Sequence, residues 1–193
     1  MAYNLPKKKD GIKLDYLPID WTTKKGRKVV LDEYDVKDEP SLHALFQDTV
    51  NVGESYPQDS ATLEEFRSYY LTHQVFVVKD SKEGNILGAF YVKPNFPGRS
   101  SHICNSGFLV DAICKGEGIG KWMVKNYLRI AADLGYKASF FNLVFEINNA
   151  MIRIAQNLGF QQAGRIPKAV KLNDGRYIDA IQFYKEFEVD GTT

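Results

Sequence analysis

The sequence predicts an α+β protein with a mixed, mostly antiparallel sheet of about six or seven strands and helices on both faces. Three short strand-like runs follow one another at 74–80, 85–94 and 101–111, and turn residues separate them, as in consecutive antiparallel strands. Residues 138–148 are apolar on both faces, which is typical of a strand covered on both sides. Helical patterns precede and follow these strands, and they are expected to supply that cover.

The first elements of this domain are a strand and two helices. Residues 28–36 predict the strand, and residues 38–50 and 60–73 predict the helices. Pro40 opens the first helix, and Thr62 stands ahead of a glutamate three positions later, in the arrangement of a helix-capping box.

A glycine-rich segment separates the third strand run from an amphipathic helix at 118–134. Gly135 follows this helix as a stop signal. One face of the helix carries the apolar residues Ile119, Met123, Tyr127 and Ile130. The remaining elements are expected as a helix at 149–160 and strands at 161–172 and 176–187.

Length and composition favour one domain. The chain has 193 residues, of which 44% are apolar, enough for one substantial core. We expect an N-terminal extension over residues 1–27 and the folded domain over 28–193. The extension is interpreted as draped on the domain or partly disordered, and the lysine run at 7–9 as solvated tail charge or, alternatively, a nuclear signal.

Charge and cysteine usage exclude several classes of function. Lysine and arginine number 25 against 24 aspartates and glutamates, so no basic field predicts a nucleic-acid or membrane partner. Cys104 and Cys114 lie ten residues apart without metal-ligand spacing, so neither a zinc site nor a disulfide framework is expected. No signal peptide or spanning segment is evident, and a cytoplasmic location is expected.

The glycine segment, "KGEGIGK", calls for a chemical explanation. It fails the P-loop pattern because Trp122 follows Gly120-Lys121, and it fails GxGxxG because Lys121 takes the third glycine position. Small residues at the start of a helix still let backbone amides approach an anion, which fits a pyrophosphate cradle. A plain glycine-rich turn is the alternative.

The spacing of Lys115-Gly116-Glu117-Gly118-Ile119-Gly120 resembles the acetyl-CoA loop of the GNAT family of N-acetyltransferases, [Arg/Gln]-x-x-Gly-x-[Gly/Ala]. The order of elements over roughly residues 28 to 187 is also similar to that family's. Lysine at the first position departs from the pattern.

By this resemblance, the site residues toward acetyl-CoA are Val110, Lys115, Gly116, Glu117, Gly118, Ile119, Gly120, Lys121 and Asn148. The Val110 amide would face the thioester carbonyl, and Asn148 would contact the pantetheine arm. Glu117 is expected to point to solvent. The family's tyrosine, which is proposed to protonate the leaving thiolate, is replaced by Ala155.

A narrower resemblance lies in "FYVKPNFPGRSSHICNSGFLVD" and "LGYKASFFNLVFEINNA". These segments are similar to proline-analogue acetyltransferases, which N-acetylate azetidine-2-carboxylate and related cyclic imino acids. The resemblance implies that Asn105 and Asn142 hold the substrate carboxylate and that Asn142, with Val110, acts in catalysis. Independently, asparagine is disfavoured in strands, and a buried amide needs partners. A structural asparagine at a bulge or against a neighbouring strand is the alternative.

The expected reaction is direct transfer of an acetyl group from acetyl-CoA to a small-molecule amine, without a metal. His102 and Glu146 are candidate proton acceptors, and the tyrosines at 56, 69 and 70 either cover the pocket or belong to the core. Two alternatives stay open: acetylation of a protein N-terminus, a lysine or a polyamine, and an inactive acyl-CoA-binding module. A homodimer is also compatible with the sequence.

Overall fold

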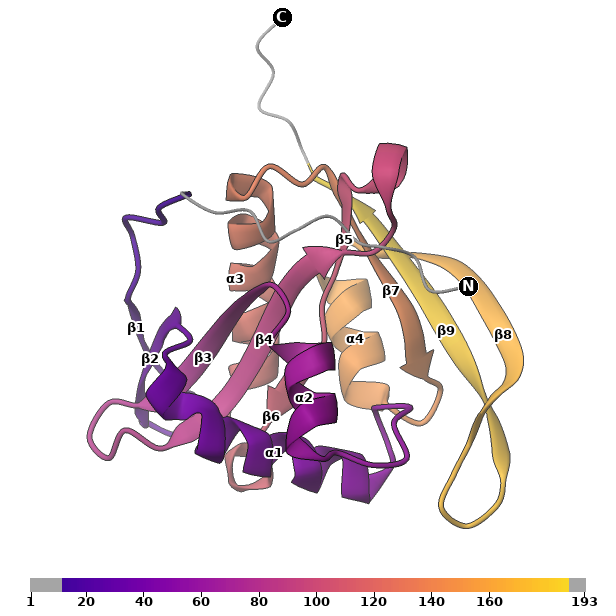
Figure 1. Cartoon of the computed structure of the whole chain (residues 1–193), viewed down its shortest axis with the longest axis horizontal. Coiled ribbons are helices and arrows are strands. Elements are labelled where there is room, and N and C mark those ends of the chain that lie inside the picture. Colours follow the sequence, from indigo (N-terminus) through magenta and orange to yellow (C-terminus); the bar gives the residue numbers. More distant parts are fainter. Residues whose placement is uncertain (1–11, 188–193) are drawn as a thin grey trace, which may run out of the picture.

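The structure, a computed structural model, describes residues 12–187, so the lysine run at 7–9 lies outside the described residues. Within residues 12–187 one nine-stranded sheet has the order β1-β2-β3-β4-β5-β7-β9-β8, with β6 placed beside β4 (Figure 1). The strands are β1 Ile19–Thr22, β2 Lys28–Glu33, β3 Gln74–Asp80, β4 Ile86–Pro94, β5 Ile103–Asn105, β6 Phe108–Val110, β7 Ala138–Phe145, β8 Gln161–Lys171 and β9 Tyr177–Glu186.

The sheet is antiparallel except at its centre. Strands β1 to β4 form a meander, β4 also pairs with β5 and β6, and β7, β9 and β8 pair antiparallel at the other end. Only β5 and β7 run parallel within the described sheet. The predicted fold class, α+β with a mostly antiparallel sheet, is therefore confirmed.

Helices cover both faces of the sheet (Figure 1). On one face lie α1, Glu39–Val52, and α2, Leu63–Tyr70; on the other lie α3, Ile119–Asp133, and α4, Asn149–Asn157. Alternation along β3 explains the two layers: Val75 and Val77 pack into the core under α1 and α2, whereas Phe76 and Val78 pack into the core under α3.

The apolar face predicted for α3 is buried. Met123, Tyr127 and Ile130 are fully buried in the core between α3 and the sheet. Full burial of one large apolar side chain contributes roughly 1.5–3 kcal/mol. The face therefore fixes the start of α3, and with it the glycine segment, against the centre of the sheet.

Helix ends agree with the capping signals in the sequence. Thr62 and Glu65 form a capping box, so α2 begins after Thr62 rather than at residue 60 as predicted. A proline lies in the first turn of α1, as expected. The Asn148 side chain accepts a hydrogen bond from the Met151 amide at 3.0 Å and caps α4.

Two departures from the predicted strands raise their number. The run at 101–111 is divided into β5 and β6 by Ser106 and Gly107. At Gly107 the carbonyl accepts from the Tyr70 hydroxyl, and Tyr56 and Tyr91 leave no room for a side chain. Residues 19–22, part of the predicted extension, pair with β2 as β1. Their four residues, "IDWT", are too short to show a strand pattern of their own.

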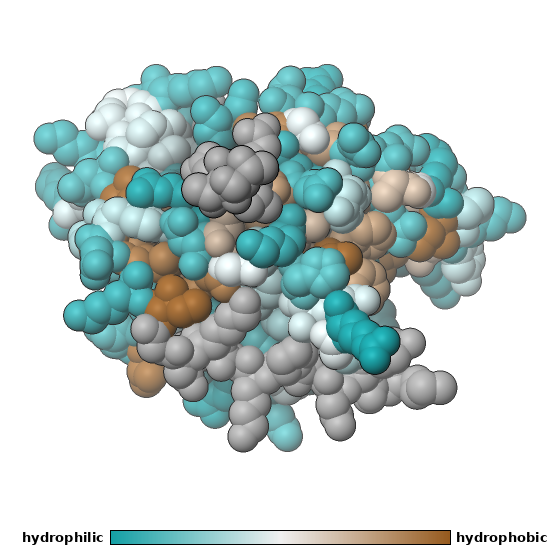
Figure 2. Space-filling view, turned by 90° about the horizontal axis from the view of Figure 1, so that it is seen from above, coloured by the Kyte–Doolittle hydropathy of each residue, from teal (hydrophilic) through white to brown (hydrophobic). Residues whose placement is uncertain are grey.

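Hydrophilic side chains dominate the face shown in Figure 2, with smaller apolar groups between them. Across residues 12–187 the structure contains no helix whose length and apolar character would allow it to cross a membrane.

Candidate active site

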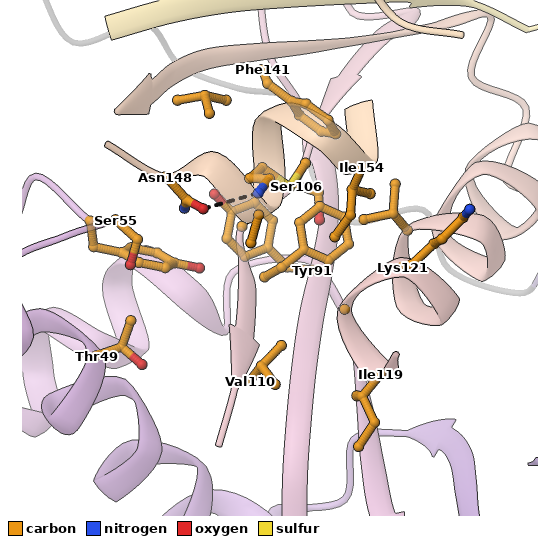
Figure 3. A pocket seen from close by; sticks show the side chains of 18 of the residues that line it. Thr49, Ser55, Tyr91, Ser106, Val110, Ile119, Lys121, Phe141, Asn148 and Ile154 are labelled. Atoms are coloured by element: carbon orange, nitrogen blue, oxygen red, sulfur yellow. Dashed lines mark hydrogen bonds between the residues drawn. The ribbon is translucent and has the colours of Figure 1, made fainter. Parts of the chain in front are cut away.

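The sheet opens between β6 and β7. Strand β5 pairs with β7 at only two positions, Ile103 with Ala138 and Cys104 with Ser139, and β6 pairs with β4 alone. A cavity of about 820 Å³ fills this opening and extends to the glycine segment. Figure 3 shows Asn148 and Ile154 on the α4 side of this cavity and Val110 on the β6 side. The topology thus brings the predicted acetyl-CoA and carboxylate residues, with the exception of Glu117, to one cavity.

The glycine segment has the backbone of an anion-binding loop. Gly116 and Gly118 have φ values of +81° and +92°, a region that favours glycine. No side chain caps the first amides of α3, and a Cβ at Gly116 would meet no described atom within 4 Å. Lys115 and Lys121 line the same end of the cavity. Bare amides at the start of a 15-residue helix, flanked by lysines, fit a pyrophosphate.

The expectation for Glu117 was wrong. Its side chain is buried, accepts a hydrogen bond from Thr23 Oγ1 at 2.9 Å, and forms an ion pair with Arg27 Nε at 3.2 Å. The Glu117 carbonyl also accepts from the Lys24 amide at 3.2 Å. These bonds turn the carboxylate away from solvent and join the β1–β2 hairpin to the glycine segment. They also lower the pKa of Glu117, first through the hydrogen bond from Arg27.

The Val110 amide faces the opening. The Asp111 amide donates to Leu87 O at 2.9 Å, so Asp111 and Leu87 form a hydrogen-bonded antiparallel pair. Such pairs alternate with non-bonded ones, and Val110, which lies opposite Gly88, is of the second kind. Its N–H therefore points away from β4, toward the gap beside β7. Val110 lines the cavity, so a ligand there can approach this edge of β6.

The two strand asparagines also line the cavity. Asn105 uses its side-chain oxygen to accept from the Ser106 amide at 2.8 Å. Asn142 lies where β7 shifts register, and its amide exchanges hydrogen bonds of 2.6 and 3.1 Å with Asn95. The structural role considered for Asn142 is therefore present, and its position in the cavity wall leaves one N–H for a ligand.

Lys93, from β4, also lines the cavity and was not identified from the sequence. Its register partner on β5 is Asn105. The Lys93 ammonium donates to Tyr69 O at 3.0 Å and lies 4.2 Å from the Tyr69 ring centre and 4.3 Å from that of Tyr91. A lysine inside an apolar strand run was the available signal, because lysine is rarely buried without a partner.

The remaining candidates divide between the cavity and other parts of the molecule. Tyr56 and Tyr69 line the cavity, whereas Tyr70 lies in the core with its hydroxyl on Gly107 O at 3.2 Å. His102 contacts Arg99 O at 3.1 Å, and it does not line the cavity.

Glu146 is also outside the cavity wall, where it pairs with Arg165. Ala155 is fully buried in α4. In the described part of the chain no group of three or more His, Cys, Asp or Glu residues could hold a metal.

Comparison with known proteins agrees with this architecture. The model of the Acetyltransferase (GNAT) domain matches residues 37–182. The structure of a GCN5-related N-acetyltransferase from Kribbella flavida superposes with a TM-score of 0.77 at 27% identity, covering 82% of this chain and 97% of that one. A phosphinothricin acetyltransferase from Sinorhizobium meliloti, in complex with AcCoA, superposes with a TM-score of 0.74 at 16% identity, covering 82% and 88%.

The chain therefore belongs to the GNAT family, an acyltransferase class that uses acetyl-CoA as its co-substrate. Among curated relatives, N-acetyltransferase aca1 of Schizosaccharomyces pombe is 46% identical over 104 residues. The match covers 53% of this chain and 50% of aca1, so the chain spans about half the length of this relative.

Proposed function

We propose that this protein N-acetylates a small cyclic imino acid, a proline analogue such as azetidine-2-carboxylate, with acetyl-CoA as donor. The observation that carries the proposal is the composition of the shared cavity. The glycine segment and the amides of Asn105 and Asn142 line the same cavity. Amide N–H groups suit a carboxylate, and the cavity joins that carboxylate site to the donor site.

In this mechanism the amine nitrogen attacks as the neutral base. The new nitrogen–carbon bond forms at the thioester carbonyl carbon while the carbon–sulfur bond breaks. The proton lost by the amine balances the proton that the leaving thiolate takes up. The Val110 N–H would donate to the carbonyl oxygen as negative charge develops there. An amine of pKa roughly 10 must lose its proton before attack, so the reaction should speed up as the pH rises.

Different residues of the cavity wall would bind different parts of acetyl-CoA and of the acceptor. Lys115, Lys121 and the amides from Gly116 to Gly120 would bind the pyrophosphate. Asn148, whose side-chain oxygen is engaged in capping α4, would face the pantetheine arm. Asn105 and Asn142 would hold the acceptor so that its nitrogen approaches the carbonyl carbon.

A lysine or polyamine acceptor fits the cavity less well. Within the described residues Asp111 is the single acidic side chain in the cavity wall, and it accepts from the Ile113 amide at 3.0 Å. Four lysines line the same wall, at positions 24, 93, 115 and 121. A second cationic group on the substrate would meet repulsion rather than a carboxylate.

Thiol release from acetyl-CoA tests the proposal directly. The purified protein is incubated with imino acids, polyamines, free lysine and peptides with free N-termini, and the thiol is titrated. We expect imino acids to give the highest kcat/KM. Greater turnover with a polyamine or a peptide would show that the acceptor is not an imino acid. No turnover with any acceptor, despite bound acetyl-CoA, would favour the inactive acyl-CoA-binding module.

A further inference from the structure

Lys93 lines the cavity beside Asn105. It is the register partner of Asn105 on the neighbouring strand, so the two side chains leave the same face of the sheet. Directly opposed residues in an antiparallel pair have Cβ atoms roughly 4.5–5.5 Å apart. A group that receives the Asn105 amide is therefore within reach of the Lys93 ammonium.

The ammonium has no counter-charge among residues 12–187. No ion pair includes Lys93, and its described contacts are the Tyr69 carbonyl and the rings of Tyr69 and Tyr91. The carbonyl takes one of its three N–H donors, which leaves two. A cation held away from water without an acidic partner is expected to bind an anion.

A neutral polar group beside Asn105 also lacks a hydrogen-bond partner among the described residues. Ser106 Oγ, next to Asn105, is buried in the cavity wall and makes no hydrogen bond with a described residue. As a hydroxyl it can donate to a carboxylate oxygen. Together with the amide of Asn105, it would surround an anion with donors on the side that faces Lys93.

We propose that Lys93 recognises the carboxylate of the acceptor and thereby selects zwitterionic imino or amino acids over amines that lack a carboxylate. The inference rests on the proposed function and adds the specificity residue to it. Lys93 acts on binding, and the same ammonium repels polyamines. The rings of Tyr69 and Tyr91 contact the cation without carrying a counter-charge, so they leave its charge available to an anion.

The alternative role for Lys93 is that of the general base. To accept a proton, the Lys93 side chain must be in its neutral form. Burial lowers the pKa of Lys93 to about 8, so both forms exist near neutral pH. The two roles differ in what they require of the substrate. A base acts on every acceptor amine, whereas a carboxylate receptor matters only for acceptors that carry a carboxylate.

The test compares matched acceptors in Lys93→Met and Lys93→Arg. Azetidine-2-carboxylate and azetidine share the ring amine and differ by the carboxylate. Lys93→Met should lower kcat/KM for azetidine-2-carboxylate about ten- to a hundredfold, the range for a lost hydrogen bond to a charged group. It should change kcat/KM for azetidine less than about threefold. Lys93→Arg should retain most of the selectivity, because the cation remains.

Binding of cyclobutanecarboxylate gives a readout that needs no turnover. This acid has the ring and carboxylate without the amine, and calorimetry should show at least about tenfold weaker binding to Lys93→Met than to the parent. Lys82→Met, at an exposed position in the β3–β4 turn, is the control and should behave as the parent. Acetyl-CoA affinity should be unchanged in all variants.

Two results would overturn the inference. Equal losses on azetidine and its carboxylate would assign Lys93 to proton transfer or to the cavity's structure. Unchanged cyclobutanecarboxylate binding in Lys93→Met would remove the carboxylate role. If the parent binds this acid through Lys93 but does not acetylate imino acids, then the proposed function fails while the inference stands.

Discussion

Asn142 combines a structural contact with a position in the cavity wall. Its amide is paired with Asn95, whose side chain does not line the cavity. Substitutions at the two residues therefore distinguish the structural role from the substrate-binding role. Substitution of either asparagine removes the same two hydrogen bonds. Only a change at Asn142 also removes the N–H that the proposal assigns to the acceptor carboxylate.

Asn142→Ala should therefore lower kcat/KM for an imino acid about ten- to a hundredfold, because a hydrogen bond to a charged group is lost. Asn142→Asp should be worse, since the new carboxylate would repel that of the substrate. Steady-state kinetics, acetyl-CoA affinity and the melting temperature are measured for both. Acetyl-CoA affinity should remain that of the parent.

Asn95→Ala is the matched control for this pair. We expect a lower melting temperature with little change in acceptor kcat/KM, since the cavity wall keeps its Asn142 amide. An Asn95 variant as impaired in acceptor kcat/KM as Asn142→Ala would show that the pair acts only through structure. An aspartate variant at 142 as active as the parent would exclude carboxylate binding.

Sequence reasoning reached residues of the cavity wall where residue type and position were both unusual. The family resemblance and the unusual position of asparagines inside apolar strands led to Asn105 and Asn142, and both line the cavity, while their role in substrate binding stays a prediction. Lys93 was missed because a lysine near the end of a strand is usually solvated, and its aromatic neighbours include Tyr69 from a different element. The error at Glu117 has the same origin, since Thr23 and Arg27 lie about ninety residues earlier.

At the element scale, the glycine segment is the part most open to a direct test. A Cβ at Gly120 would lie 3.5 Å from Ile154 Cδ1 and 3.7 Å from Val110 Cγ2, which are ordinary contacts. The further methyl groups of valine must then enter the cavity. Gly118, in contrast, has a φ of +92°, so any side chain there also strains the backbone.

Gly120→Val should accordingly abolish acetyl-CoA binding with little change in the melting temperature, and Gly118→Val should lose both binding and stability. Calorimetric titration with acetyl-CoA and thermal unfolding provide the two readouts. Gly120→Ala is the control, because the loop pattern accepts alanine and its single methyl makes only ordinary contacts. If a folded Gly120→Val protein bound acetyl-CoA with the affinity of the parent, the glycine segment would not be the pyrophosphate cradle.

The bonds of Glu117 to Thr23 and Arg27 clamp the glycine segment to the β1–β2 hairpin, and this clamp predicts a pH-dependent stability. Hydrogen bonds from Arg27 and Thr23 lower the pKa of Glu117 below its ordinary 4.5, so the folded state favours the ionised carboxylate. This contribution is present above the unfolded pKa and is lost as the pH falls through the lowered folded pKa.

Glu117→Gln should lower the melting temperature at neutral pH, and the gap to the parent should narrow as the pH falls below about 4.5. Thermal unfolding across this range measures the gap. Glu64→Gln, at an exposed position in the first turn of α2, should show no comparable gap. A difference between parent and Glu117→Gln that does not vary with pH would contradict a clamp based on charge.

The order of helices and strands from residue 28 onward was predictable because it follows from periodicity and turn residues, which are local. The division of residues 101–111 into β5 and β6 was not, because Gly107 there contacts tyrosines of other elements, which the local sequence does not show. The opening of the sheet beside β6 follows from that division. The position of the cavity is therefore a tertiary property, although most of its wall residues were visible in the sequence.

The pH dependence of turnover should reflect two titrating groups in the whole enzyme, the acceptor amine and the Lys93 ammonium of the cavity. The amine must be neutral to attack, so kcat/KM should rise with pH through the neutral range. Carboxylate recognition needs Lys93 in its charged form. The ionisable side chains that face it are Tyr69 from α2 and Tyr91 from β4, and burial raises the pKa of Tyr91 well above its usual value.

Because burial lowers the pKa of Lys93 to about 8, the two requirements oppose each other above that pH. For azetidine-2-carboxylate, the logarithm of kcat/KM should rise with a slope of about one up to about pH 8 and then level off, since the loss of charged Lys93 offsets the gain in neutral amine. In Lys93→Arg the rise should continue toward about pH 10, because arginine stays protonated. Rates with azetidine should lack the break in both proteins. A break near pH 8 that persists in Lys93→Arg would assign it to another group, and a flat profile from about pH 6 to about pH 9 would mean that a step other than proton removal limits the reaction.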